Sequence, residues 1–374
     1  MNDSTQLEAP AVAKNGDMKQ RMVGIEIENL HLSFGQTEVL SGVDLTIEPG
    51  EFFAFLGPSG SGKSTLLRAI AGFGPRPRGM IRIGGRDVID LPPWKRNVGM
   101  VFQSYALWPH LSVRENVAFG LRELRFPRAE IGPRVDAALD LVGLRDLADR
   151  MPNQLSGGQQ QRIALARTVV VEPQVLLLDE PLSNLDANLR VQMRRELLAL
   201  QRKLGLTTIF VTHDQEEANT TSDRMAVLDG GVIQQVGTPQ QLYDAPCNLF
   251  VAGFLGTANI LEGRVERDGE AVRFVTTTGE ALPIAEAEPG RGSIVLRPQN
   301  ITLTTDGGPG TIAGEVVHRE FLGSQIRYIV QAAGAEIIVD QSHSVGTDWQ
   351  EIGAKVSLRI NARTAVVIPR GHGA

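Results

Sequence analysis

Apolar and polar residues alternate along two early segments of the chain. Ile25–Phe34 and Val43–Ile47 both follow a period of two, which is the pattern of a strand with one buried and one exposed face. We therefore expect both segments to be strands of an antiparallel sheet at the start of the fold.

Shorter segments that are apolar almost throughout follow at intervals. They are Phe52–Leu56, Val98–Phe102, Val175–Leu178 and Thr208–Thr212. Such runs are typical of strands that are buried on both faces of a parallel sheet. Because apolar residues at helical spacing follow the first run, in Ser64–Ala71, the pattern predicts an α/β fold.

Residues 104–165 lose this strand character. The prolines that divide the segment are Pro109, Pro127, Pro133 and Pro152. Amphipathic stretches such as Val135–Val142 lie between them. We expect a mostly helical insertion that opens near Gln103 and closes in the helix after Ser156.

The pattern changes again after about residue 235. Gln240–Tyr243 is expected to start a short helix, and Pro246 and Gly256 lie in a linker. Short strands then recur between glycine-rich turns, which predicts a small β-barrel. The expected strands are Ile294–Leu296, Ile301–Thr304, Gln325–Val330, Ile337–Val339, Val356–Ile360 and Ala365–Ile368.

A chain of 374 residues is too long for one ordinary domain. We expect four parts in chain order. They are a disordered polar tail over 1–22, an α/β domain over 23–240 with its helical subdomain at about 104–165, a linker over 241–257, and a β domain over 258–374.

Composition narrows the classes of protein that remain. Hydrophobic content of 42% and charged content of 21% support a folded core, and a net charge of −6 argues against a nucleic-acid surface. The single cysteine, Cys247, excludes an internal disulfide, favours a reducing compartment, and is expected to be packed. The sequence lacks both a transmembrane run and a secretory signal, so we expect a cytoplasmic protein whose membrane role comes through a partner.

Residues 57–64 read GPSGSGKS and lie between a predicted strand and a predicted helix. This is a complete phosphate-binding loop, in which glycines let backbone N–H groups converge on phosphate oxygens. The lysine supplies charge to the β- and γ-phosphates, and the serine hydroxyl faces Mg²⁺. The expected nucleotide-binding residues are Gly57, Pro58, Ser59, Gly60, Ser61, Gly62, Lys63, Ser64 and Thr65.

A second chemical motif ends the strand that begins at Val175, where residues 175–180 read VLLLDE. Successive side chains of a strand face opposite ways. Asp179 and Glu180 are therefore expected to do different jobs.

Residues 155–159 read LSGGQ and lie between these two motifs. The order of the three motifs resembles the ATP-binding cassette (ABC) family. The resemblance implies a P-loop ABC ATPase domain with a parallel core sheet, an antiparallel β subdomain and a helical subdomain. It also implies a head-to-tail homodimer of C₂ symmetry. Each ATP in that pair lies between the phosphate loop of one chain and Ser156, Gly157, Gly158 and Gln159 of the other.

The resemblance also implies roles for residues at the strand ends. Asp179 resembles the Walker B aspartate, which steadies Mg²⁺, and Glu180 resembles the general base that polarises the attacking water. Gln103 resembles the Q-loop glutamine, which touches Mg²⁺ and the water. His213 resembles the switch histidine that contacts the γ-phosphate. The implied magnesium ligands are Ser64, Gln103 and Asp179, and the implied catalytic residues are Glu180, His213 and Gln103.

Further positions match the family less directly. Residues 183–186 (SNLD) resemble the D-loop at the dimer seam, which places Asp186 in the nucleotide site. Phe34 resembles the aromatic residue that stacks on adenine, and core packing is the alternative for it. After Gln103, a proline-interrupted run is expected to expose a surface that docks on a membrane partner. Its residues are Tyr105, Leu107, Trp108 and Pro109, and burial of Trp108 in the helical subdomain is the alternative.

The last third of the chain points to one branch of the family. Residues 296–301 (LRPQNI) and 321–323 (FLG) resemble the C-terminal TOBE domain, an oligosaccharide-binding-like (OB-like) barrel of bacterial importer ATPases. Residues 181–190 (PLSNLDANLR) and 254–261 (FLGTANIL) fit the group that serves polyamines, ferric iron and 2-aminoethylphosphonate. The sequence does not choose among these cargos.

The resemblance thus implies the ATP-hydrolysing subunit of a bacterial importer, with ATP and Mg²⁺ as cofactors. The implied partners are a second copy, two integral-membrane permease subunits and a periplasmic or extracellular solute-binding protein, without nucleic acid. The implied location is peripheral, on the cytoplasmic face of the inner membrane. Two alternatives stay open: a soluble ABC ATPase without a transport role, and a transport ATPase gated by a ligand of the C-terminal domain.

Overall fold

The computed structural model describes residues 22–370 apart from residues 269–270, 309 and 347. All but the last residue of the expected tail over 1–22 therefore lies outside the described residues. The chain divides into two compact units, Met1–Pro239 and Gln240–Ala374.

The first unit begins with an antiparallel sheet in the order β2-β1-β4-β5. Its strands are β1 (Ile25–Phe34), β2 (Thr37–Ile47), β4 (Arg78–Ile83) and β5 (Arg86–Asp87). Alternation predicted β1 over its whole length but only the second half of β2. The first half was missed because its polar residues interrupt the alternation.

The central sheet has the order β10-β9-β3-β8-β7-β6. Neighbours from β9 to β6 pair in parallel, and β10 pairs with β9 in the antiparallel sense. The expected α/β fold with a parallel core sheet is therefore confirmed. The strands are β3 (Phe52–Leu56), β6 (Val98–Val101), β7 (Val175–Asp179), β8 (Thr207–Thr212), β9 (Arg224–Asp229) and β10 (Val232–Gly237).

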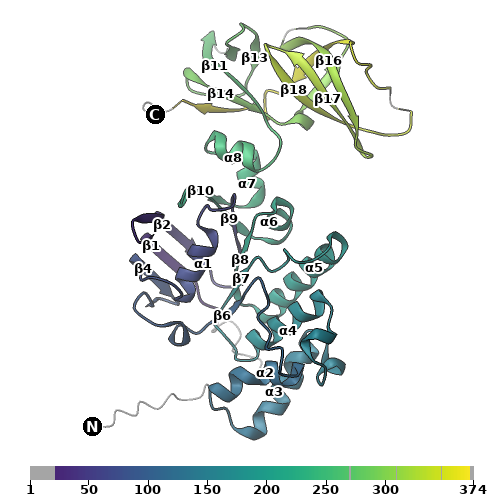
Figure 1. The fold of residues 1–374 in the computed structure, drawn as a ribbon. Coiled ribbons are helices and arrows are strands. Elements are labelled where there is room, and N and C mark those ends of the chain that lie inside the picture. Colours follow the sequence, from purple (N-terminus) through teal and green to yellow (C-terminus); the bar gives the residue numbers. More distant parts are fainter. Residues whose placement is uncertain (1–21, 269–270, 309, 347, 371–374) are drawn as a thin grey trace. The chain divides into compact units, whose positions relative to one another are not determined.

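Helix α1 (Lys63–Ala71) packs with both sheets, as Figure 1 shows. Leu66, Leu67 and Ile70 of this helix share one buried cluster with Ile25 of the antiparallel sheet and Phe55 of the central sheet. Burial of such aliphatic side chains stabilises the fold by about 1.5–3 kcal/mol each. This packing fixes the start of α1 against the end of β3.

The predicted helical insertion contains three α-helices, which lie together in Figure 1. They are α2 (Val113–Glu123), α3 (Arg128–Leu141) and α4 (Gly157–Val169), with short 3₁₀ turns at Pro93–Lys95, Arg145–Leu147 and Pro152–Gln154 nearby in the chain. Both α2 and α4 begin with a capping box, in which a serine and the residue three positions on bond each other's backbone N–H groups. Local sequence thus sets where these helices begin.

Two more helices follow strands of the central sheet. They are α5 (Ala187–Leu204), which ends at Gly205, and α6 (Gln215–Thr221). Asp186 and Asp214 are their N-cap residues, and each carboxylate accepts hydrogen bonds from the first turn. No helix of the described chain is long and apolar enough to cross a membrane.

The second unit begins with α7 (Pro239–Asp244), whose first residue still belongs to the first unit, and α8 (Leu249–Phe254). The expected linker over 241–257 therefore contains a second helix, which Asn248 caps. Arg297 ties this segment to the strands, because its guanidinium donates hydrogen bonds to the carbonyl oxygens of Tyr243, Ala252, Gly256 and Thr257. Cys247 is exposed rather than packed, so the expectation of a packed cysteine was wrong.

The rest of the second unit is all β, as the sequence predicted. One sheet has the order β13-β12-β11-β14-β20, and the other has the order β15-β19-β16-β17-β18. All of these neighbours are antiparallel, and residues of both sheets form one buried cluster. The curled strands thus enclose a common core in the manner of an OB-like barrel.

The strands of the first of these sheets are β11 (Asn259–Asp268), β12 (Ala271–Thr276), β13 (Ala281–Pro283), β14 (Gly290–Leu296) and β20 (Val366–Pro369). Those of the second are β15 (Ile301–Thr304), β16 (Thr311–Phe321), β17 (Gln325–Ala332), β18 (Ala335–Ser342) and β19 (Lys355–Ile360). The sequence patterns did not predict β11, β12, β13 and β16. Polar residues and glycines interrupt the alternation in β11 and β16, and β13 is only three residues long.

Candidate nucleotide-binding site

Four parallel strands of the central sheet end along one edge. Their register pairs Leu56 of β3 with Thr212 of β8, and Asp179 of β7 with Val211 of β8. In α/β folds the carboxyl ends of such strands are the usual place for a ligand. The predicted residues that follow these strand ends are Gly57, Gln103, Glu180 and His213.

The phosphate loop makes a tight turn between β3 and α1. Gly62 has a φ of 98°, and a Cβ at this position would lie 2.9 Å from Cδ2 of Leu40. A Cβ at Gly57 would lie 2.2 Å from the carbonyl oxygen of Leu228. Only glycine fits either position. The turn leads directly into the first N–H groups of α1, which have no helical partners and favour an anion.

Lys63 is buried inside this loop, with 6% of its surface exposed. Its Nζ donates hydrogen bonds to the carbonyl oxygens of Gly57 at 2.9 Å and Pro58 at 2.7 Å. Burial lowers the pKa of the Lys63 ammonium, and the carboxylates of Glu180 and Asp179 oppose that shift. The side chain is therefore a cation held close to the place where phosphates would bind.

Asp179 is held by two residues of α1. The Ser64 hydroxyl donates a hydrogen bond of 2.7 Å to its Oδ1, and the Arg68 guanidinium donates one of 3.1 Å to its Oδ2. Asp179 itself is 3% exposed. A hydroxyl and a carboxylate oxygen side by side are the hard donors that Mg²⁺ prefers, so these residues fit a magnesium ion.

Gln103, Glu180 and His213 also come together at this edge. The amide nitrogen of Gln103 donates a hydrogen bond of 2.9 Å to Oε2 of Glu180, and Nδ1 of His213 lies 3.5 Å from Oε1. Glu180 has a φ of 46°, in the left-handed backbone region that residues with a Cβ rarely adopt. A carboxylate on a strained backbone, beside an amide and an imidazole, is the arrangement expected of a catalytic centre.

Ser183 and Asn184 brace this group. The Ser183 hydroxyl donates a hydrogen bond of 3.0 Å to the Glu180 carbonyl oxygen, and the Asn184 amide donates one of 2.8 Å to the Gln103 carbonyl oxygen. The segment after β7 is therefore bonded to the segment after β6. Asp186, which the sequence placed in the nucleotide site, caps α5.

The residues Ser156–Gln159 form the start of α4. The backbone N–H of Ser156 donates to the side-chain oxygen of Gln159 at 2.9 Å, and the backbone N–H of Gln159 donates to the Ser156 hydroxyl at 3.4 Å. Each side chain thus accepts a hydrogen bond from the other residue's backbone. The N–H groups of Gly157 and Gly158 lie in the first turn of the helix, where an anion is favoured.

Phe34 stands at the end of β1 with 52% of its surface exposed. The alternative that Phe34 belongs to the core is therefore wrong. Its ring is accessible for stacking.

The segment after Gln103 is only partly exposed. Tyr105 is buried, so the expectation that it lies on the surface was wrong. Trp108 is half-buried, with its ring 4.1 Å from that of Phe119 and 4.7 Å from the Arg167 guanidinium. Arg167 also donates hydrogen bonds to the carbonyl oxygens of Tyr105 and Ala106. A surface of exposed aromatic residues is thus smaller than the composition suggested.

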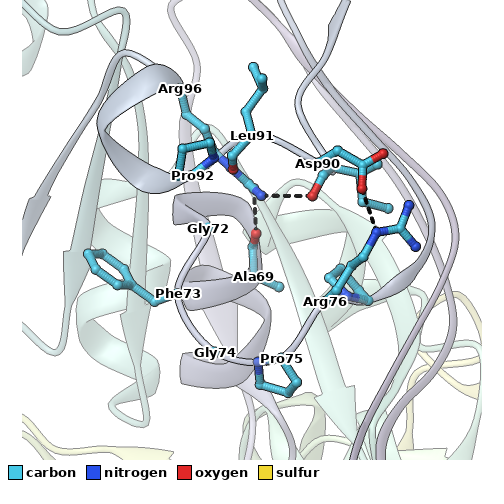
Figure 2. Close-up of a pocket in the computed structure, with 12 residues that line it drawn as sticks. Ala69, Gly72, Phe73, Gly74, Pro75, Arg76, Asp90, Leu91, Pro92 and Arg96 are labelled. Carbon is cyan, nitrogen blue, oxygen red and sulfur yellow. Dashed lines mark hydrogen bonds and ion pairs between the residues drawn. The ribbon is translucent and has the colours of Figure 1, made fainter.

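A hollow of about 230 Å³ lies at the C-terminal end of α1 (Figure 2). Arg96 lies against it and donates hydrogen bonds to the carbonyl oxygens of Ala69, Ile70 and Ile89. The bonds to Ala69 and Ile70 satisfy carbonyl groups in the last turn of the helix. The hollow lies at the opposite end of α1 from the phosphate loop, and we assign it no nucleotide.

The sequence analysis missed Arg68, Arg167 and the contact of Asn184 with Gln103. Arg68 had a signal, because it follows Ser64 by four positions and so lies on the same face of α1. The contacts of Asn184 and Arg167 had no such signal, since each residue bonds a backbone carbonyl group more than 60 positions away. Such contacts depend on which strands are neighbours.

Two family models match the chain. A model described as ABC transporter matches residues 40–183, and one described as TOBE domain matches residues 294–368. The first spans the phosphate loop, LSGGQ and the carboxylate pair. The second lies within the antiparallel strands of the second unit.

Curated relatives extend the similarity over nearly the whole chain. The Fe(3+) ions import ATP-binding protein of Brucella abortus is 43% identical over 351 residues, which cover 92% of this chain and 97% of that protein. The spermidine/putrescine import ATP-binding protein of Rubrobacter xylanophilus is 45% identical over 361 residues, which cover 94% and 96%.

A solved structure also matches the fold. It is cbiO1 from Clostridium perfringens, part of the ABC transporter complex cbiONQ, with 33% identity and a TM-score of 0.55. The match covers 58% of this chain and 89% of that one. On these similarities and the motifs at the sheet edge, the chain belongs to the ABC transporter family and is the ATP-hydrolysing subunit of a bacterial importer.

Proposed function

We propose that the edge of the central sheet binds ATP with Mg²⁺ and that Glu180 directs the hydrolysis. The observation that carries this proposal is the assembly of Ser64 with Asp179 beside Gln103, Glu180 and His213. These residues come from four separate segments. Their convergence supports one reaction centre.

Ser64, Asp179 and Gln103 would hold Mg²⁺, which when bound would neutralise charge on the phosphate oxygens. Lys63 would exchange the carbonyl oxygens of Gly57 and Pro58 for phosphate oxygens, because its ammonium already lies at the base of the loop. Phe34 would stack on the adenine. The other nucleotide contacts would come from the backbone of residues 57–65.

Glu180 would accept the proton of the attacking water. General-base catalysis of this kind typically contributes about 10²–10⁴-fold. Gln103 and His213 contact its two carboxylate oxygens, and so would orient the group and the water. The left-handed φ of Glu180 supports a functional role, since strain persists where the surrounding structure maintains it.

We infer that two copies close head to tail around two ATP molecules. The helix start at Ser156–Gln159 supports this, because its N–H groups favour an anion, and Ser156 and Gln159 accept hydrogen bonds from each other's backbone N–H rather than from a distant group. Each ATP would lie between residues 57–65 of one copy and this helix start of the other. Asp186 and the segment before it would line the seam.

An import ATP-binding subunit, which is what the relatives are by name, works with membrane permease partners. We propose two permease subunits, which residues 104–119 would contact from the cytoplasmic face of the inner membrane, and an external solute-binding protein. The proposed cargo is a polyamine, ferric iron or 2-aminoethylphosphonate. The names of the relatives support the first two.

The test uses tagged full-length protein with Glu180→Gln, and with Glu288→Gln as an exposed carboxylate control in the second unit. Glu180→Gln should lower hydrolysis by about 10²–10⁴-fold, keep ATP binding, and elute as a dimer in ATP and Mg²⁺. Glu180→Gln captured from solubilised membranes in ATP should bring a multi-span permease with it. The wild type and Glu288→Gln should bring less of that permease. Normal hydrolysis by Glu180→Gln would refute the catalytic role, and a monomer in ATP would refute the closed dimer.

A further inference from the structure

Arg190 joins two segments that both border the nucleotide site. It lies in the first turn of α5, and its guanidinium donates a hydrogen bond of 3.1 Å to the carbonyl oxygen of Leu185. The same group lies 3.5 Å from Oδ2 of Asp214 and 3.6 Å from Oε1 of Glu217. One cation thus contacts the segment after β7 and the first turn of α6.

Glu217 connects this cation to the position of His213. It is 4% exposed, and its Oε2 accepts a hydrogen bond of 2.6 Å from the hydroxyl of Thr212, the residue before His213. The backbone N–H of Asp214 donates to the same hydroxyl at 3.0 Å. A buried carboxylate needs a charged or hydrogen-bonding partner on each side. Thr212 and Arg190 are those partners.

The segment that Arg190 contacts through Leu185 also reaches the start of α4. A Cβ on Gly157 would lie 3.6 Å from Cδ2 of Leu185, and one on Gly158 would lie 3.2 Å from Cδ2 of Leu189. The start of α4 therefore lies beside Leu185 and Leu189, in the segment that leads into Arg190. Packed groups of this kind move together, because a close-packed interior does not deform continuously.

We propose that Arg190, through Glu217, is a positioning residue that couples the start of α4 to His213. This inference rests on the head-to-tail dimer proposed above. In that dimer the start of α4 faces the ATP held by the partner, whereas His213 faces the ATP of its own chain. Arg190 therefore links the two ATP sites through a single subunit.

A merely structural ion pair would have a different consequence. Its loss would lower the stability of α5 and α6 and leave each ATP site to work as before. Loss of a coupling residue lowers the turnover rate and the cooperativity between the two ATP sites. The affinity for ATP stays nearly unchanged. The Hill coefficient for ATP separates the two roles, since it reaches at most the number of coupled sites, which is two here.

The experiment compares Arg190→Met and Arg190→Lys with Arg195→Met, which removes an exposed arginine from the same helix. Steady-state hydrolysis is measured against ATP concentration, and thermal unfolding is measured in parallel. Arg190→Met should lower kcat by about tenfold, move the Hill coefficient to about 1, and change KM by less than about twofold. Arg190→Lys should recover only part of kcat. Lysine keeps the charge, but its ammonium reaches fewer of the three acceptors. Arg195→Met should match the wild type.

Glu217→Gln gives a second test that does not depend on the folding of the arginine variants. Glutamine keeps the shape and can still accept the Thr212 hydrogen bond, but it loses the charge that faces Arg190. Glu217→Gln should therefore lower the Hill coefficient, as Arg190→Met does. Wild-type cooperativity in both Arg190→Met and Glu217→Gln would overturn the proposal, as would a wild-type Hill coefficient of 1. Failure of the wild type to hydrolyse ATP, or of Glu180→Gln to dimerise, would instead refute the proposed function.

Discussion

The Ser64 hydroxyl donates a hydrogen bond of 2.7 Å to the Asp179 carboxylate, although 115 positions separate the two residues. They meet because α1 follows β3, and β7 lies two strands from β3 in the central sheet. Arg68, one turn further along α1, takes the other carboxylate oxygen. The proposed magnesium ligands are thus oriented within the protein itself.

Arg68→Met should lower the affinity of the site for Mg²⁺ without removing a proposed contact to the nucleotide. Loss of its hydrogen bond frees one Asp179 oxygen to rotate, and partners of metal ligands typically affect metal affinity by about 10–100-fold. The Mg²⁺ concentration for half-maximal hydrolysis should rise by about tenfold, and Arg68→Lys should restore part of the affinity. An unchanged Mg²⁺ titration in Arg68→Met would show that Ser64 alone orients the carboxylate.

Glu180→Gly should be more stable to unfolding than Glu180→Ala. Both Glu180→Gly and Glu180→Ala lose the contacts with Gln103 and His213, so their difference reports the cost of a Cβ at a φ of 46°. The free energy of unfolding, measured with urea, should be about 1 kcal/mol higher for glycine. At Arg195, inside α5, the same pair should give the opposite order by about 1 kcal/mol. Equal stability of the two Glu180 variants would mean that this backbone relaxes.

Ser156→Ala and Ser112→Ala form a matched pair, since both remove the serine of a capping box. Each should lower the free energy of unfolding by about 1 kcal/mol. Only Ser156→Ala should also weaken ATP-driven dimerisation in the Glu180→Gln background, because only the start of α4 is proposed to face the partner's ATP. Analytical ultracentrifugation with and without ATP measures this. Equal dimerisation by the two variants would argue against the proposed seam.

Arg297→Met should destabilise the second unit and spare the nucleotide site. The change leaves the buried carbonyl group of Ala252 and the partly buried one of Tyr243 without this donor. Unsatisfied buried acceptors cost about 1–3 kcal/mol each, so the free energy of unfolding should fall by roughly 2–4 kcal/mol. Calorimetry should show the loss in the transition of residues 240–374, while ATP binding stays at the wild-type level. Weaker ATP binding would show that the units unfold together.

Glu217 should make stability depend on pH. Burial raises the pKa of its carboxyl group above 4.5, as does the charge of Asp214, while the Thr212 hydroxyl, Arg190 and Arg194 lower it. Between pH 4.5 and the raised value, the folded chain keeps a proton that the unfolded chain has released. Its stabilising effect is therefore lost as the pH rises through that window.

Glu217→Gln removes this titration. The difference in unfolding free energy, wild type minus Glu217→Gln, should fall as the pH rises above about 4.5, as urea unfolding at each pH would measure. Exposed Glu288→Gln serves as the control and should show no such trend. A difference that rises with pH would mean that the charged form of Glu217 is favoured in the folded state.

Elements whose signals are local could be predicted from the sequence. The phosphate loop, the buried strands β3, β7 and β8, and the carboxylate pair at Asp179 and Glu180 could be found because glycine spacing, apolar runs and strand ends are properties of neighbouring residues. The LSGGQ motif and the all-β character of the last third were predicted for the same reason. The functional class was therefore predictable from the order of these motifs.

How these motifs meet is seen in the folded chain and not in the sequence. The contacts of Arg68 with Asp179, of Asn184 with the Gln103 carbonyl group, and of Arg190 with Glu217 depend on the strand order, which no short pattern encodes. Burial of Tyr105 and exposure of Cys247 likewise depend on what packs against them. A residue type sets what a side chain prefers, but its partners are set by the elements that folding brings beside it.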